Sequence, residues 1–138
     1  MKLILLLASV FCLTMVKAEP MRDGLWEIST SVEMKINGRT NKMPPQVRRQ
    51  CLRKEEFKNL PKAKDLPANF VCKTIKEERK GEKIFTVQEC SGGGITHIYS
   101  SVGTYREDYM EIVTEMKIKG SKDVSRSTMI AKRVGDCK

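Results

Sequence analysis

The sequence predicts an all-β protein: an antiparallel meander of about seven strands that forms a barrel or a strongly curved sheet. The clearest pattern covers residues 24–36, where the even positions from Trp26 to Ile36 are apolar or threonine and the odd ones are polar. Side chains of a strand alternate between its faces, so this pattern is typical of a strand with one buried face. Asn37-Gly38 then supplies the residues that a two-residue hairpin turn favours. Similar runs follow at short spacing, without the strand–helix alternation of a parallel sheet.

The rest of the chain continues this pattern with one interruption. The second strand, within 39–51, contains Met43-Pro44-Pro45, so it is either an edge strand or a short one that begins near Gln46. Residues 53–60 hold strong helix formers and precede Pro61, so one short helical insertion is expected there. Five further strands are expected at 70–77, 83–90, 95–105, 109–118 and 123–134.

The first residues are expected to be a signal peptide. Met1-Lys2 is a short positive start, residues 3–16 are apolar and uncharged, and Val16-Lys17-Ala18 has small residues where a signal peptidase reads the chain. The apolar run is shorter than the roughly 20 residues that span a bilayer. We therefore expect cleavage after Ala18, no transmembrane segment in the mature chain, and a single β domain at 19–138 that is periplasmic or secreted.

The mature chain is basic. Removal of 18 of the 138 residues leaves 120, enough for one domain with a modest core. Lys2 and Lys17 leave with the signal peptide, so the formal net charge falls from +9 to +7. The remaining positive charge still favours anionic partners. Seven cations form what we call the basic cluster: Arg48, Arg49, Arg53, Lys54, Lys58, Lys62 and Lys64.

The basic cluster has two interpretations. It is either a patch for anionic headgroups or acidic glycans, or a solvated insertion that its charge keeps soluble. Nucleic acid is not an expected partner, because the chain is exported and lacks aromatic side chains interleaved with the cations for base stacking.

Four cysteines remain after cleavage: Cys51, Cys72, Cys90 and Cys137. An even count in a small exported chain is typical of two disulfides, whereas a metal site needs more closely spaced ligands. A three-residue loop at 80–82 places Cys72 opposite Cys90 on adjacent strands, which leaves Cys51 for Cys137. That pairing requires residues 52–69 to cross from one end of the sheet to the other. The alternative is Cys51–Cys72 with Cys90–Cys137.

Several short motifs occur in a fixed order along the mature chain. They are Gly24-Leu25-Trp26-Glu27, Met43-Pro44-Pro45, Gln50-Cys51-Leu52, a further Cys72, Glu89-Cys90-Ser91-Gly92 and Gly135-Asp136-Cys137. In this combination the chain resembles a family of small exported bacterial proteins, domain of unknown function family 3617. The resemblance implies an exported, disulfide-bonded β domain, and it implies no activity.

Gly24-Leu25-Trp26 also resembles the G-x-W that opens the first strand of lipocalin-type barrels. That resemblance implies that a basic residue from the last strand, here Arg133 or Arg126, packs over the tryptophan in a cation–π contact. The likeness concerns architecture alone and carries no function.

No pattern in the sequence predicts catalysis. His97 is the only side chain that titrates near neutrality, and it lies mid-strand without a cysteine, aspartate or serine motif nearby. G-x-S-x-G and H-E-x-x-H are both absent, and the cysteines are expected to be oxidised. Four methionines offer soft Cu(I) ligands in principle, but core packing explains them better. We therefore expect no enzyme activity, no cofactor and no metal.

Two functions fit these observations. The first is the binding of a small apolar or lipid-like ligand on the apolar inner face, in a cavity above about 300 Å3. The residues expected to line it are Trp26, Ile28, Val32, Ile112 and Met116. The second is a structural or interaction role in the cell envelope, in which the edge strand at 39–51 and the basic cluster meet an anionic surface or a protein partner.

Overall fold

The structure is a computed structural model that describes residues 21–57 and 69–138, so the expected signal peptide at 1–18 lies outside the described residues. Seven strands of the described chain form one antiparallel sheet, which confirms the predicted fold class. The elements are β1 (Gly24–Ile36), β2 (Arg39–Leu52), α1 (Lys54–Phe57), β3 (Val71–Lys80), β4 (Lys83–Gly92), β5 (Ile95–Arg106), β6 (Tyr109–Ile118) and β7 (Val124–Gly135).

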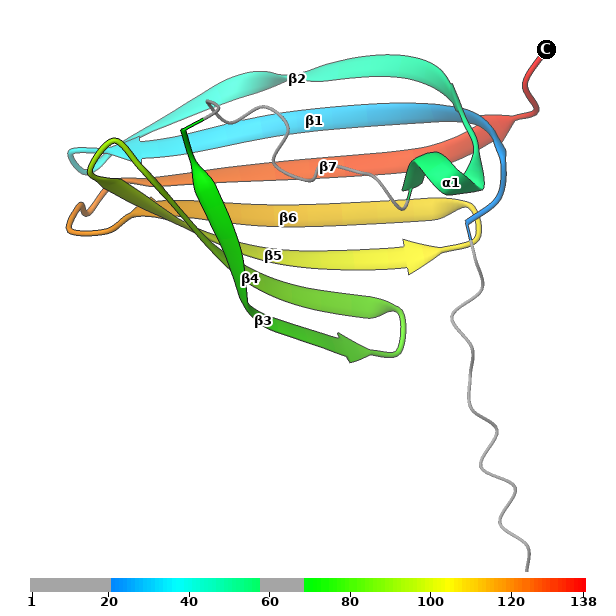
Figure 1. Ribbon diagram of the computed structural model, residues 1–138. Coiled ribbons are helices and arrows are strands. Elements are labelled where there is room, and N and C mark those ends of the chain that lie inside the picture. Colours follow the sequence, from blue (N-terminus) through cyan, green and yellow to red (C-terminus); the bar gives the residue numbers. More distant parts are fainter. Residues whose placement is uncertain (1–20, 58–68) are drawn as a thin grey trace, which may run out of the picture.

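The strand order in the sheet is β2-β1-β7-β6-β5-β4-β3. Strands β3 to β7 are a meander, and β1 joins it by pairing with β7. β2 and β3 are the two edges of the sheet, and they do not pair with each other in the described part of the chain. β3 and β4 bend away from the plane of the other strands (Figure 1). The sheet is therefore open and strongly curved, which is the second of the two predicted forms.

β2 is an edge strand, as predicted, but it is not short. It pairs with β1 from Arg39 to Leu52, and Pro44 and Pro45 together lie opposite Ser31 in a bulge. Proline lacks the N–H that a ladder hydrogen bond needs, and a bulge on an edge strand tolerates that loss. The predicted start near Gln46 is therefore wrong, because the bulge lets the strand continue through the prolines.

The end of β2 and the start of β3 lie at opposite ends of the sheet. β2 ends where β1 begins and β7 ends, whereas β3 begins at the opposite end, where β4 ends and β5 begins. This is the crossing that the favoured cysteine pairing requires. The structure contains that pairing, Cys51–Cys137 and Cys72–Cys90, so the alternative pairing is wrong.

The hairpin of β3 and β4 reaches the expected Cys72–Cys90 pairing by a different geometry. Its loop has two residues, because Lys80 pairs with Lys83, whereas three were predicted. The register then shifts by one residue at Ile75, between Thr74 and Lys76, in a bulge. The bulge adds the residue that the loop lacks, and the two cysteines still lie directly opposite each other, with Cα atoms 4.0 Å apart.

The core lies on one face of the sheet, which we call the inner face, and is concentrated at one end of it. Trp26, Ile28, Met110 and Ala131 are 0–2% exposed, and Met21 and Leu52 complete the cluster. Ile28, Ala131 and Met110 are direct cross-strand neighbours on β1, β7 and β6. The small Ala131 lies between two large side chains, and this alternation of sizes lets the three strands pack closely.

α1 follows β2 at this end of the sheet (Figure 1). It is a single turn at 54–57, so it begins one residue later than predicted, and residues 58–60 of the predicted helix lie outside the described residues. The carboxylate of Glu56 accepts the Arg53 N–H at 2.6 Å, and Asp23 accepts the Lys54 N–H at 2.7 Å. These bonds satisfy amide groups that the first turn of a helix leaves without partners.

Candidate functional site

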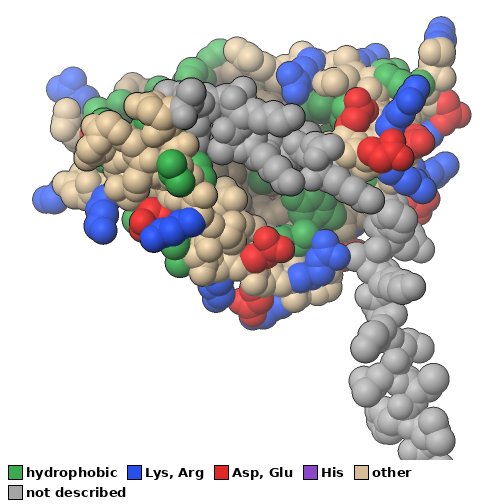
Figure 2. All heavy atoms as spheres, viewed as in Figure 1, with side chains coloured by type: hydrophobic (Ala, Val, Ile, Leu, Met, Phe, Trp, Pro, Cys, Tyr) green, Lys and Arg blue, Asp and Glu red, His purple; other side chains and the backbone are tan. Residues whose placement is uncertain are grey.

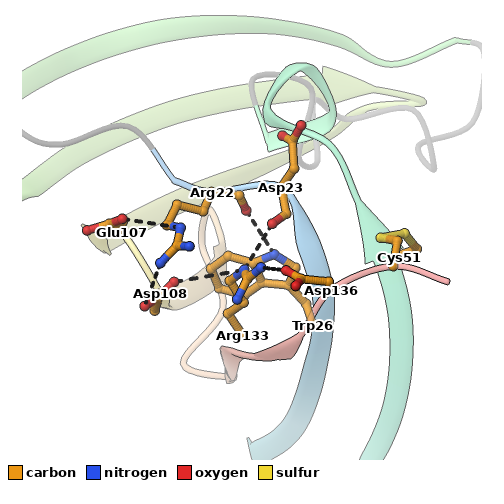
Figure 3. Close-up of polar contacts among 9 residues, drawn as sticks. Arg22, Asp23, Trp26, Cys51, Glu107, Asp108, Arg133 and Asp136 are labelled. Atoms are coloured by element: carbon orange, nitrogen blue, oxygen red, sulfur yellow. Dashed lines mark hydrogen bonds and ion pairs between the residues drawn. A yellow bond between two sulfur atoms is a disulfide. The ribbon is translucent and has the colours of Figure 1, made fainter.

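Polar groups close the core around Trp26 (Figure 3). Its indole N–H donates to the Arg22 carbonyl at 3.2 Å. Arg133 is the cross-strand partner of Trp26, and its guanidinium donates to the Asp23 carbonyl at 2.9 Å and to the Asp136 carboxylate. Arg133 is thus the basic residue of the last strand that lies beside the tryptophan, and its cation–π contact with the ring stays a prediction.

The alternative prediction, that Arg126 lies beside Trp26, is wrong. Arg126 pairs in register with Glu33 on the opposite face of the sheet, which we call the outer face. Gly24 explains why the motif begins with glycine: a Cβ there would lie 2.5 Å from Arg133 Nε and 2.6 Å from the Gly135 carbonyl oxygen. The Gly24-Leu25-Trp26 motif is therefore accounted for by packing.

The charged side chains of this cluster pair with one another. Arg22 forms ion pairs with Glu107 at 3.3 Å and Asp108 at 3.7 Å, beside the Arg133 bonds (Figure 3). Arg133 is largely covered, with 14% of its side chain exposed. The cluster therefore stabilises the end of the sheet at which Trp26 lies.

The five residues expected to line a ligand site all lie on the inner face. Trp26 and Ile28 are 0% and 2% exposed and pack against the protein's own side chains, so they have no surface left for a ligand. Val32, Ile112 and Met116 are half-buried, and Ile112 packs against the core cluster.

An open groove of about 480 Å3 lies on the outer face across β3 to β7, and we call it the outer groove. Its floor contains Phe85, Val102 and Val113, which are direct cross-strand neighbours on β4, β5 and β6. Val102 is 37% exposed, and Phe85 and Val113 are half-buried. A contiguous apolar row on the solvent side of a one-layer sheet marks a surface that suits an apolar ligand.

Charged side chains line the rims of the outer groove. On β3, Glu78 pairs with Lys80 at 2.9 Å and with Lys76 at 3.2 Å. The hydrogen bonds from Lys80 and then Lys76 hold the pKa of Glu78 below its ordinary value, so this carboxylate is ionised at neutral pH. On the other side the lining includes Glu115 and Arg126.

Arg126 connects the outer groove to a second one. A groove of about 670 Å3 at the Pro44-Pro45 bulge also has Arg126 in its lining. The cross-strand neighbours of Arg126 are Glu33 and Glu115, and each of them pairs with a lysine, at 3.2 and 2.8 Å. Arg126 is exposed and forms no ion pair with any described residue, so its guanidinium is available to an anionic group.

The described members of the basic cluster do not share one face of the sheet. Arg48 lies opposite Ile28 on the inner face, whereas Arg49 is on the outer face and pairs with Glu27 at 2.9 Å. Arg53 and Lys54 follow at the start of α1 and are exposed. The remaining members, Lys58, Lys62 and Lys64, lie outside the described residues. Figure 2 shows cations and anions scattered together over the visible face.

His97 lies on the inner face of β5, opposite Cys90 of β4. Its ring stacks on Phe70 with centroids 5.3 Å apart, and it meets Tyr99 edge-on at 6.2 Å. Its Nδ1 atom is buried and has no hydrogen-bond partner among the described residues. Burial raises the pKa of Tyr99 above its ordinary value, so that phenol is not a base at neutral pH.

Residues 21–57 and 69–138 contain no group of three histidine, cysteine or acidic side chains that could hold a metal ion. Nor does this part of the chain contain a helix of the length and apolarity needed to cross a membrane.

Comparison with curated proteins and with solved structures finds no match to this chain. A family model described as "Protein of unknown function (DUF3617)" matches residues 21–137. The chain therefore belongs to the DUF3617 family.

Proposed function

We propose that this protein is an exported, non-catalytic binding module that holds a small apolar or lipid-like ligand in the outer groove. The observation that carries the proposal is the row of Phe85, Val102 and Val113, which stays partly exposed on the outer face. The volume of about 480 Å3 lies within the roughly 300–1,000 Å3 typical of ligand sites. Burial of this row by a ligand gains about 25 cal/mol for each Å2 of apolar surface.

The charges around the groove favour a ligand with one anionic end. Arg126 has no ion pair among the described residues and lies where the two grooves meet. A carboxylate or phosphate at this point gains a charge-assisted hydrogen bond, while an acyl chain covers the apolar row. The proposed ligand is therefore an anionic amphiphile.

The substitution Val102→Lys tests the outer groove. It places a long charged side chain in the middle of the apolar row, and we expect the affinity for a fluorescent fatty acid to fall at least tenfold. Val102 is 37% exposed, so the ammonium group stays hydrated in the free protein and the fold is retained. Fluorescence titration measures the affinity, and circular dichroism checks the fold.

Val47→Lys is the matched control, because Val47 is 62% exposed and belongs to β2, away from the outer groove. It should bind the fatty acid as the unchanged protein does. Equal affinity of all three proteins, or equal loss in both variants, would contradict a site at the outer groove.

A second function has its own observation in its favour. Every residue of β2 before Leu52 is exposed, and the strand contains four cations and no acidic residue. Its outer edge has no partner strand in the described chain, and Arg39 and Arg48 form no ion pair with described residues. These features support an interaction role in the cell envelope, in which β2 lies against an anionic surface or an acidic partner segment.

Arg39→Gln combined with Arg48→Gln tests this role by co-sedimentation with phosphatidylglycerol vesicles. We expect release of the variant at lower salt than the unchanged protein, because two contacts to headgroups are lost. Lys122→Gln combined with Lys132→Gln removes the same charge from exposed positions away from β2 and should change retention less. If both double variants release at the same salt concentration, only net charge matters and β2 is not the contact surface.

A further inference from the structure

We propose that the Cys72–Cys90 disulfide is a thiol–disulfide exchange site, at which a small thiol attacks Cys72 and His97 stabilises the released Cys90 sulfur. This inference is independent of the proposed ligand and of the outer groove. It joins three observations: the unequal exposure of the two cysteines, the place of Cys72 on an edge strand, and an unpartnered nitrogen on His97, the cross-strand neighbour of Cys90.

The two cysteines differ in exposure. Cys72 is exposed on the edge strand β3, whereas Cys90 on β4 is 1% exposed. A thiolate therefore reaches Cys72 and not Cys90. Exchange at a disulfide depends on which sulfur is accessible and on how well the other sulfur leaves. The fold thus fixes the roles: Cys72 forms the mixed disulfide and Cys90 is the leaving group.

The exchange balances with a small thiol as the co-reactant. The electron pair of the thiolate forms a bond to the Cys72 sulfur, the Cys72–Cys90 bond breaks, and its electron pair leaves on Cys90, which takes a proton from water. A second thiolate then attacks the sulfur of the small thiol in the mixed disulfide and releases the Cys72 thiolate. The protein is reduced by two electrons, and the two small thiols are oxidised to their disulfide.

His97 provides a partner for the leaving sulfur. It is the direct cross-strand neighbour of Cys90, and both side chains lie on the inner face. Stacking on Phe70 holds the imidazole in place, and Nδ1 is buried without a hydrogen bond. In the disulfide form Cys90 has no proton to offer. After reduction its S–H donates to a bare Nδ1, or a protonated Nδ1 donates to the thiolate.

The reduced form therefore gains a hydrogen bond that the oxidised form lacks. A buried polar atom without a partner is unfavourable, so relief of this defect favours reduction. Cys51–Cys137 has no such neighbour among the described residues: it joins the end of β2 to the C-terminal tail, and both its cysteines are exposed. The two disulfides of one molecule should therefore respond differently to a change at His97.

The test compares the equilibrium of each disulfide with glutathione in the intact protein. Samples in graded glutathione buffers are quenched with an alkylating reagent, and mass spectrometry counts the oxidised fraction of each cysteine pair. His97→Phe keeps the ring stacked on Phe70 but removes Nδ1, and we expect its Cys72–Cys90 bond to be about fivefold harder to reduce. His97→Gln restores a hydrogen-bonding group and should recover part of the difference. Cys51–Cys137 serves as the internal control and should not change.

Trapping at early times should show glutathione on Cys72 and not on Cys90. The proposal is overturned if His97→Phe leaves the Cys72–Cys90 equilibrium unchanged or shifts both disulfides equally. It is also overturned if glutathione is found on Cys90, or if Cys72–Cys90 is reduced only together with loss of the β-sheet circular dichroism signal.

Discussion

Trp26→Ala is expected to lower the free energy of unfolding by about 3–5 kcal/mol. The side chain is 0% exposed and sits at the centre of the inner-face cluster. Truncation removes its apolar area and leaves a cavity beneath the polar closure, and Arg133 loses the ring that it lies beside. Urea unfolding followed by circular dichroism measures the difference, because the variant loses the only tryptophan fluorescence signal.

Val47→Ala is the control for this effect. Val47 is 62% exposed on the edge strand, so its truncation should change the free energy of unfolding by about 0.5 kcal/mol or less. A domain of this size has a total stability of roughly 5–15 kcal/mol, so the two variants differ by a large share of it. If Trp26→Ala cost less than about 1 kcal/mol, the core would not lie at this end of the sheet.

Replacement of Cys51 and Cys137 by alanine is expected to lower the free energy of unfolding by about 4–5 kcal/mol. The bond joins residues 86 positions apart, and a long closed loop restricts the unfolded chain most. It also ties the edge strand β2 to the end of β7, which otherwise meets β2 only through β1. Urea unfolding of the double variant gives the difference.

The other disulfide is the matched comparison. Cys72 and Cys90 are 18 positions apart, so the corresponding double alanine variant should lose about 3 kcal/mol. The order of the two losses tests the prediction more strictly than either value, because both variants remove one cross-link and two sulfur atoms. A larger loss from the shorter loop would show that native packing around Cys90, and not restriction of the unfolded chain, determines the stability.

Much of the fold followed from the alternation of side chains. β1 and β6 each have an apolar and a polar register, and their apolar members Trp26, Ile28 and Met110 became the core. The cysteine pairing followed from the same reasoning, because cross-strand cysteines can be matched by counting from a turn. The count succeeded although the loop was one residue too long, since the bulge at Ile75 compensated for it. Local spacing does not reveal such a bulge.

The outer groove was not found from the sequence. Phe85, Val102 and Val113 come from three different strands, and each looks like an ordinary strand residue in its own context. Only the register between strands places them in one row. In β4 and β5, apolar residues occur at both odd and even positions, so neither face of these strands is purely polar. This was the signal in the sequence that could have indicated an apolar surface on the outer face. The opening between β2 and β3 was equally hidden, because pairing of distant strands depends on the curvature of the whole sheet.

The strand order also has a consequence for how the chain folds during synthesis. β1 is the first of the seven strands to be synthesised, yet β7, which pairs with it in the sheet, is the last. The β3 to β7 meander has only sequence-local contacts and should form first, whereas docking of the β1–β2 hairpin closes the longest loop and comes late. Cys72 and Cys90 can therefore pair early, whereas Cys51 has no native partner until Cys137 has emerged.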